Sequence, residues 1–172
     1  MAPGGGDALR LRSEAMSTPA PLERRIVSPD PAATLALGRA LATAARPGDL
    51  ICLWGDLGAG KTQLAKAIGA GIGVTDTIAS PSYILMAEYE GRLPLFHLDL
   101  YRLADASDVF AGGLIDDRQT AGLTLVEWPD RMAAMLPGER LDVLIDGAGD
   151  APRVITVRAG SPRLQRDLDV LP

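Results

Sequence analysis

A glycine-rich octapeptide that ends in a lysine and a threonine is the part of this sequence best suited to chemistry. It matches the pattern G-x-x-x-x-G-K-[ST] at every fixed position, and its residues are Gly55, Asp56, Leu57, Gly58, Ala59, Gly60, Lys61 and Thr62. In such a loop the backbone N–H groups converge on phosphate, the lysine reaches the β- and γ-phosphates, and the hydroxyl ligates Mg²⁺. We therefore predict that these eight residues bind a nucleoside triphosphate together with Mg²⁺.

The flanking segments fit this reading. The apolar run LICLW at 50–54 has the length and composition of a strand that is covered on both faces. Residues 61–70 have a helical pattern, and the amino end of a helix offers unpaired N–H groups and a positive dipole to an anion. A buried strand, a glycine-rich turn and a helix in this order are typical of a phosphate-binding loop.

Two carboxylates follow other apolar runs. Glu127 ends LTLV at 123–126, as in a Walker-B element, and Asp99 ends LFHL at 95–98. Hydrolysis of a nucleotide needs an acid for Mg²⁺ or its water ligands and a group that orients the attacking water. Because ligands gather at strand ends on the loop side of an α/β sheet, we expect both acids to lie near the octapeptide.

Of three residues beside these acids, two have no single interpretation. His97 shares a strand face with Asp99 and is either a hydrogen-bonded structural residue or a proton shuttle. Arg102 is either a surface ion-pair partner or a phosphate contact. Trp128 follows Glu127 and is interpreted as a boundary residue between a strand and a helix.

Composition limits the classes of function. The 172 residues suit one domain, and a net charge of −5 with a pI near 4.8 leaves no basic stripe for tight binding to nucleic acid. The lone Cys52 excludes an internal disulfide and fits a reducing compartment. Neither a membrane span nor a secretory signal is present in the sequence, so we expect a cytoplasmic protein that does not contact a membrane.

The order of elements predicts the fold. Strand patterns alternate with helical patterns along the chain. The strand patterns lie at 24–27, 50–54, 123–128, 141–146 and 153–159, and a hairpin is expected within 83–103 with its turn near 90–92. Ser28 is predicted to cap the first helix. The expected fold is α/β, a P-loop NTPase-like three-layer sandwich with a mixed, mostly parallel sheet flanked by helices. We expect 1–24 to be a disordered tail, 25–160 the ATPase domain, and 161–172 a C-terminal tail or short helix.

Several NTPase classes fit poorly. A guanine-specific domain carries an N-K-x-D-type element, which the chain lacks. A small-molecule kinase usually has an arginine-bearing lid, and no arginine cluster lies between the two acids. A motor or transporter ATPase would be longer.

Four motifs together resemble one family. GDLGAGKT (55–62), SPSYIL (80–85), HLDLYRL (97–103) and LVEWPD (125–130) occur in the order and spacing of the TsaE family, also called YjeE, and the likeness extends from about residue 28 to 159. The family's usual second motif is S-P-T-F. Here Ser82 and Tyr83 replace its last two residues, and they keep a hydroxyl and a ring.

The resemblance implies a small ATPase that is required for N6-threonylcarbamoyladenosine at tRNA position 37. Such a protein acts on the TsaD–TsaB pair, meets tRNA through that complex, binds ATP and Mg²⁺, and hydrolyses ATP weakly alone. The family's Mg²⁺-associated acid corresponds to Glu127 and its acid for hydrolysis to Asp99. Ser80 to Tyr83 resembles a switch-like loop near the γ-phosphate, and the helix entry near Ser28 approaches the base.

The predicted site therefore has three sets of residues. The catalytic residues are Lys61, Asp99 and Glu127, and the metal ligands are Thr62, Asp99 and Glu127. Ser80 and Ser82 join the octapeptide as nucleotide contacts. Two other functions stay open, namely a nucleotide-dependent binding module with incidental hydrolysis and a kinase for a small metabolite.

Overall fold

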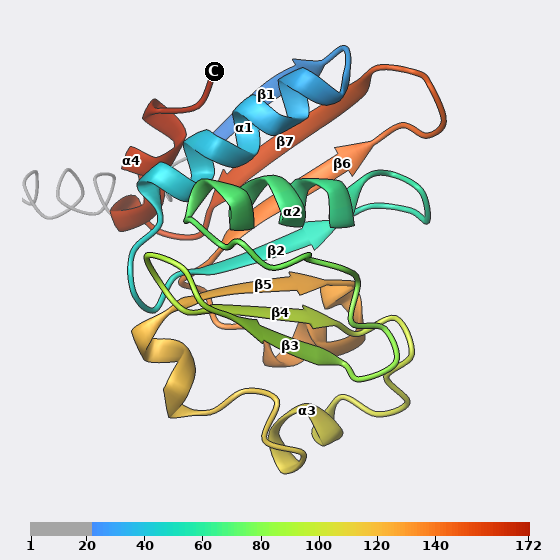
Figure 1. Ribbon diagram of the computed structural model, residues 1–172, viewed down its shortest axis with the longest axis vertical. Coiled ribbons are helices and arrows are strands. Elements are labelled where there is room, and N and C mark those ends of the chain that lie inside the picture. Colours follow the sequence, from blue (N-terminus) through green and yellow to red (C-terminus); the bar gives the residue numbers. More distant parts are fainter. Residues whose placement is uncertain (1–21) are drawn as a thin grey trace, which may run out of the picture.

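A seven-stranded mixed sheet forms the centre of the molecule in the computed structural model, which describes residues 22–172 (Figure 1). Its strands are β1 (Leu22–Ser28), β2 (Leu50–Trp54), β3 (Met86–Tyr89), β4 (Leu95–Asp99), β5 (Leu123–Glu127), β6 (Leu141–Asp146) and β7 (Arg153–Ala159). Their order across the sheet is β1-β7-β6-β2-β5-β4-β3. Strand β2 pairs in parallel with β5 and β6, and β4 pairs in parallel with β5, whereas β3 and β7 run antiparallel to their neighbours.

Helical elements cover both faces of the sheet. The first face carries α1 (Pro31–Ala44), α2 (Lys61–Gly71) and α4 (Pro162–Asp169). The second face carries α3 (Ser107–Ala111) and the 3₁₀ segment η2 (Pro129–Met135), and a further 3₁₀ segment, η1 (Asp117–Ala121), precedes β5. The predicted α/β sandwich with a mixed sheet flanked by helices is confirmed. The sheet is not mostly parallel as expected, because three of its six strand pairings are antiparallel. No helix within residues 22–172 has the length and apolar character needed to cross a membrane.

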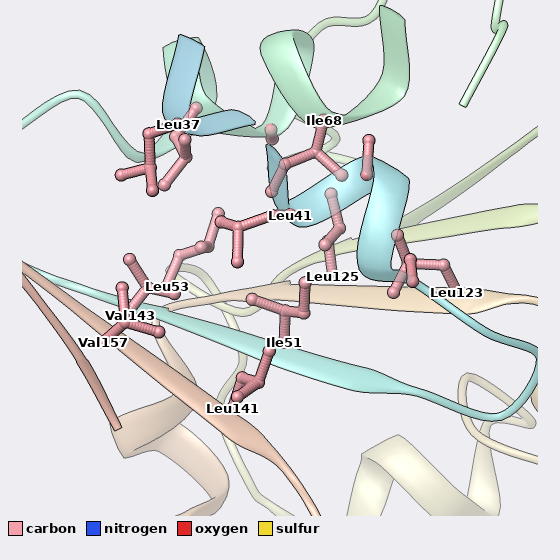
Figure 2. Packing of buried hydrophobic residues seen from close by; sticks show 14 of the residues in the cluster. Leu37, Leu41, Ile51, Leu53, Ile68, Leu123, Leu125, Leu141, Val143 and Val157 are labelled. Atoms are coloured by element: carbon pink, nitrogen blue, oxygen red, sulfur yellow. The ribbon is translucent and has the colours of Figure 1, made fainter. Parts of the chain in front are cut away.

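Aliphatic side chains fill the core between the sheet and its first face (Figure 2). Leu37 and Leu41 from α1 and Ile68 from α2 pack over Leu53 and Leu125 of the sheet. The two helices approach closely because α1 has a glycine at position 38, where an added Cβ would stand 2.3 Å from the Ala67 Cβ. Because side chains alternate between the two faces along β2 and β5, Cys52 and Val126 belong to the buried cluster on the second face of the sheet. Burial is the main cause that raises the pKa of the Cys52 thiol to about 12, so this cysteine is an inert core residue.

The start of α1 differs from the prediction. Asp30, not Ser28, is the N-cap, and its carboxylate accepts a hydrogen bond of 2.8 Å from the Ala33 N–H. A proline follows each candidate, Pro29 after Ser28 and Pro31 after Asp30, so the place of Ser28 in β1 decides between them. Ser28 ends β1 instead, and its hydroxyl contacts the Thr34 hydroxyl at 2.7 Å.

The two ends of the described chain pack on the domain. Strand β1 begins at Leu22, three residues before the expected domain start, and the rest of the predicted tail lies outside the described residues. In 161–172, for which a tail or short helix was predicted, α4 forms and buries Leu164 and Leu168 in the core. Arg163 on α4 also bonds to the buried Asp49, at 3.0 Å. Thus α4 belongs to the same packed unit as the sheet.

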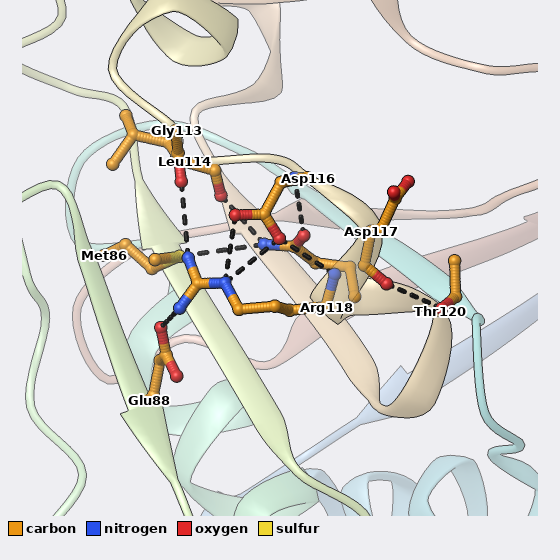
Figure 3. A network of polar contacts seen from close by, with 9 residues as sticks. Met86, Glu88, Gly113, Leu114, Asp116, Asp117, Arg118 and Thr120 are labelled. Atoms are coloured by element: carbon orange, nitrogen blue, oxygen red, sulfur yellow. Dashed lines mark hydrogen bonds and ion pairs between the residues drawn. The ribbon is translucent and has the colours of Figure 1, made fainter.

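A polar network fixes the segment that precedes β5 against the edge strand β3 (Figure 3). The Arg118 guanidinium bonds to Glu88 on β3, to Asp116 at 2.9 Å and to the Gly113 carbonyl oxygen at 3.4 Å. Asp116 and Gln119 form a reciprocal capping box at the start of η1. Because exposed ion pairs contribute little stability, the network chiefly positions this connection along the sheet edge.

Candidate nucleotide-binding site

The octapeptide forms the turn that links β2 to α2. Gly55, Gly58 and Gly60 have φ values of +146°, +78° and +110°, in a region that side chains strongly disfavour. Gly60 is the N-cap of α2. Because glycine has no side chain, the cap residue leaves the first N–H groups of the helix without a side-chain acceptor. A backbone of this shape can hold an anion at the amino end of α2.

Lys61 lies at the base of this turn with its ammonium folded toward the loop. Its Nζ donates to the carbonyl oxygens of Gly55 and Asp56 at 2.6 and 2.8 Å. The same atom stands 3.8 Å from the ring centroid of Trp128. The side chain is 5% exposed, and burial lowers the pKa of Lys61 while the carboxylates of Glu127 and Asp99 act in the opposite direction.

Thr62, Glu127 and His97 form a hydrogen-bonded chain in which Thr62 is half-buried and the other two residues are buried. The Thr62 Oγ1 lies 3.0 and 2.9 Å from the two Glu127 carboxylate oxygens, and the His97 Nε2 lies 2.8 Å from Oε1. His97 is 0% exposed and Glu127 is 2% exposed. Of the two interpretations of His97, the structure favours a hydrogen-bonded residue that holds the carboxylate, and its Nδ1 has no hydrogen-bond partner among the described residues.

Asp99 holds the loop that contains the SPSYIL motif. Its Oδ2 accepts hydrogen bonds from the hydroxyls of Ser80 and Ser82, the latter at 2.8 Å, and its Oδ1 accepts the Tyr101 N–H at 3.0 Å. Tyr83 in the same loop is 85% exposed, and the Arg102 guanidinium lies 4.3 Å from its ring centroid. Arg102 therefore contacts the loop and makes no ion pair among the described residues.

Nine of the twelve sequence-predicted residues line one pocket of about 430 Å³. Its lining comes from the octapeptide, the start of α2, the 80–85 loop and the ends of β4 and β5, and consists of Leu57, Gly58, Gly60, Lys61, Thr62, Gln63, Ser80, Ser82, Asp99, Tyr101, Glu127 and Trp128. Gly55 and Asp56 serve the same pocket indirectly, through the carbonyl oxygens that hold Lys61.

A second pocket of about 830 Å³ shares Gly60 and Gln63 with the first. It lies between the start of α1, where Ser28 and Asp30 line it, and the 149–151 loop before β7. Ala59 also lines it, and the Ala59 carbonyl oxygen accepts a hydrogen bond of 2.8 Å from Arg153 Nε on β7. The two pockets therefore meet along the octapeptide.

Among the pocket residues that sequence reasoning missed are Gln63, Tyr101 and Arg153, and it gave Trp128 no contact role. Tyr101 and Trp128 follow the two acids directly, so adjacency was a usable signal for them. Arg153 lies more than 90 residues from the octapeptide, and only the pairing of β7 with β6 brings it near. No local pattern indicates that contact.

The polar groups suit a magnesium–nucleotide complex better than a metal held by protein alone. Within residues 22–172 no group of three or more His, Cys, Asp and Glu side chains is arranged to hold a metal ion. The pocket offers a hydroxyl and two carboxylates, from Thr62, Asp99 and Glu127. Mg²⁺ usually takes one or two such oxygens and completes its shell with phosphate and water, so this donor set fits.

Comparison with known proteins places the chain among a set of bacterial relatives. Residues 28–155 match the family model described as threonylcarbamoyl adenosine biosynthesis protein TsaE. The tRNA threonylcarbamoyladenosine biosynthesis protein TsaE of Bacillus subtilis is 41% identical over 145 residues, which are 84% of this chain and 89% of that protein. The corresponding protein of Treponema pallidum is 38% identical over 64% of this chain and 82% of its own length.

A solved structure shows the same fold. The crystal structure of YdiB from Bacillus subtilis superposes with a TM-score of 0.73 at 33% sequence identity, over 87% of this chain and 94% of that one.

Proposed function

This chain belongs to the TsaE family of threonylcarbamoyl adenosine biosynthesis proteins, and we propose on this premise that it is a P-loop ATPase that supports threonylcarbamoyladenosine formation at tRNA position 37. In this proposal it binds ATP with Mg²⁺ in the cytoplasm and acts on the TsaD–TsaB pair. Hydrolysis changes its affinity for that pair and resets the complex between rounds, which is a ligand-driven shift of population.

One observation carries the proposal. A phosphate-binding loop, a helix amino end, a lysine, a threonine and two carboxylates from neighbouring strands share a single pocket. Binding and hydrolysis of a nucleoside triphosphate need this combination of groups. The larger adjoining pocket gives room for a nucleoside beside the phosphate site.

Each polar side chain has a role suited to its surroundings. Lys61 neutralises phosphate charge, and Thr62 ligates Mg²⁺ by its hydroxyl. Glu127, fixed by Thr62 and His97, holds Mg²⁺ or its water ligands. Asp99 orients the attacking water, and Ser80 and Ser82 contact the terminal phosphate when the loop that carries them moves. Bound Mg²⁺ supplies charge neutralisation to the phosphates.

The charge of the chain supports action through a partner. With a net charge of −5 the protein is poorly suited to hold tRNA itself. We therefore propose that the TsaD–TsaB pair holds the RNA and also completes or stimulates the ATPase site. Nanomolar binding of tRNA by the isolated chain at physiological salt would contradict this part.

The test is ATP turnover with and without the TsaD–TsaB pair, for the wild type and Lys61→Ala. We expect slow turnover alone, stimulation by the pair, and loss of both in the variant. Transfer of phosphate to an added metabolite, without partners, would support a kinase instead. Repeated cycling of the complex by a Glu127 or Asp99 variant that binds but does not hydrolyse ATP would support a nucleotide-dependent binding module.

A further inference from the structure

Trp128 adopts a backbone conformation that is unusual for a large aromatic residue. Its φ and ψ are 58° and 49°, and within residues 22–172 only Leu85 shares a positive φ among residues other than glycine. Left-handed backbone at a bulky residue is strained and persists where surrounding contacts determine it. Here the chain leaves β5 directly after Glu127, and the Trp128 ring comes to lie against the Lys61 ammonium.

We propose that Trp128 is a positioning residue for Lys61. A lysine ammonium has three N–H donors, and the carbonyl oxygens of Gly55 and Asp56 take two of them. The centroid of the Trp128 ring lies 3.8 Å from Nζ, so the ring face can attract the ammonium without accepting a conventional hydrogen bond from it. The ring thus holds the ammonium at the base of the phosphate pocket and leaves the third N–H free to turn to an anion.

The chemistry of the ring suits this task. The face of an aromatic ring attracts a cation, most strongly in tryptophan and less in phenylalanine, whereas leucine has no such face. A carboxylate at this place would form a direct hydrogen bond with the third N–H and compete with phosphate for it. An aromatic face offsets part of the desolvation of the buried ammonium without forming that bond.

The neighbours of Trp128 fix the ring. Tyr101 lies 4.9 Å away between ring centroids at an interplanar angle of 47°, and the buried cluster of the second sheet face packs against the indole. The ring–ammonium contact is a property of the chain alone. Its consequence for phosphate rests on the proposed function, so the two parts need separate measurements.

The first measurement detects the contact without nucleotide. Lys61 and Lys66 are the two lysines of the chain, so lysine labelled with ¹³C at Cε gives one signal for each. We expect the Lys61 ε-protons to be shifted upfield by the ring current and Lys66, an exposed residue of the same helix, to be unshifted. The shift should vanish in Trp128→Leu and persist in part in Trp128→Phe. An unshifted Lys61 signal in the wild type would overturn the proposal.

The second measurement tests the effect on phosphate binding. Dissociation constants for ATP–Mg²⁺ are compared for the wild type, Trp128→Leu, Lys61→Met and the double variant. We expect Trp128→Leu to weaken binding about tenfold and Trp128→Phe only a few-fold, in keeping with the strength of such contacts. In the Lys61→Met background Trp128→Leu should have little further effect, because the partner of the ring is already absent.

The pattern of results separates this proposal from a purely structural role. Equal weakening by Trp128→Leu in both lysine backgrounds, or equal affinities for the Phe and Leu variants, would show that the ring only packs. Fluorescence of Trp54, the sole tryptophan left in these variants, monitors their folding. If the wild type binds no nucleotide, the proposed function fails, whereas the NMR signal still decides whether Trp128 holds Lys61.

Discussion

Asp99 and Glu127 lie directly opposite each other as paired residues of the parallel strands β4 and β5, yet different segments bond to their side chains. Glu127 is bonded to Thr62 at the start of α2 and to His97. Asp99 is bonded to Ser80 and Ser82 of the 80–85 loop. Helix α2 and the 80–85 loop are therefore tied to the sheet through separate acids, and substitutions should affect them separately.

Replacing the charge of Glu127 should separate binding from hydrolysis. In Glu127→Gln the amide oxygen can still accept the Thr62 hydroxyl, so ATP affinity should stay within several-fold of the wild type. Turnover should fall about 100-fold or more, because under the proposed role a neutral amide holds Mg²⁺ or its water ligands less well and the metal's stabilisation of the transition state is lost. Asp130→Asn is a matched control, because Asp130 is exposed and belongs to the same LVEWPD motif. Wild-type turnover in Glu127→Gln would contradict the role assigned here.

His97 should act through Glu127. In His97→Leu the buried carboxylate loses a hydrogen-bond partner, which should lower the free energy of unfolding by about 1–3 kcal/mol. Under the proposed role of Glu127, turnover should fall about 10- to 100-fold, as when other hydrogen-bond partners of a metal-holding residue are removed. His97→Gln, which can donate a hydrogen bond, should recover part of both losses. Unchanged turnover in stable His97→Leu protein would show that His97 only packs.

The two serines should control the mobility of the 80–85 loop. In the double variant Ser80→Ala, Ser82→Ala, Asp99 keeps its bond from the Tyr101 N–H but loses both hydroxyl donors. Amide hydrogen exchange in the loop should then speed up about tenfold, while β5 stays protected. Ser107→Ala on α3 serves as the control. If exchange in the loop is unaffected, the hydroxyl bonds do not restrain it.

Much of this site could be predicted because its residues stand at the ends of recognisable elements. The octapeptide has a fixed pattern, and Asp99 and Glu127 each follow an apolar run, so parallel pairing of β4 with β5 brings them together. The position of α1 was predicted less well. Ser28 and Asp30 are both good N-caps, and only the packing of Ser28 as the last residue of β1 decides between them.

Other contacts depend on distances in space that no local pattern encodes. Arg153 reaches the octapeptide because β7 returns antiparallel to β6. Trp128 reaches Lys61 through a left-handed residue, a conformation that propensities assign to glycine or asparagine. For 161–172 a tail or short helix was predicted, and α4 is a short helix; that its Leu164 and Leu168 pack in the same core as α1 follows only from the fold.

The stability of the protein at acidic pH should depend on the protonation of Asp167. Burial is the main cause that raises the pKa of this carboxyl above its ordinary value of 3.8. The other charged groups that affect it are Arg166, Asp49, Arg163 and Arg46. Because the folded state holds the proton more tightly than the unfolded chain, this contribution to stability is full below pH 3.8 and is lost as pH rises through the raised pKa.

Asp167→Asn removes that titration. The unfolding temperature of the variant should therefore rise relative to that of the wild type as pH rises from about 3 to 7. This trend is expected whether the variant is more or less stable than the wild type at pH 3. Thermal unfolding followed by circular dichroism across this range measures the trend. A constant difference at every pH would mean that the carboxyl titrates alike in the folded and unfolded chains.

The core role of α4 predicts a large effect at Leu168. Leu168 is 5% exposed and packs in the same cluster as Leu37 and Leu41 of α1. Leu168→Ala should lower the free energy of unfolding by about 2–5 kcal/mol, because the loss of buried methyl groups adds to the cost of the cavity left behind. Urea denaturation measures the change. Val170, which is 55% exposed two residues later, gives a control in Val170→Ala that should change stability by less than about 0.5 kcal/mol. Similar small effects at both positions would mean that α4 is a loosely attached tail and that the domain ends at β7.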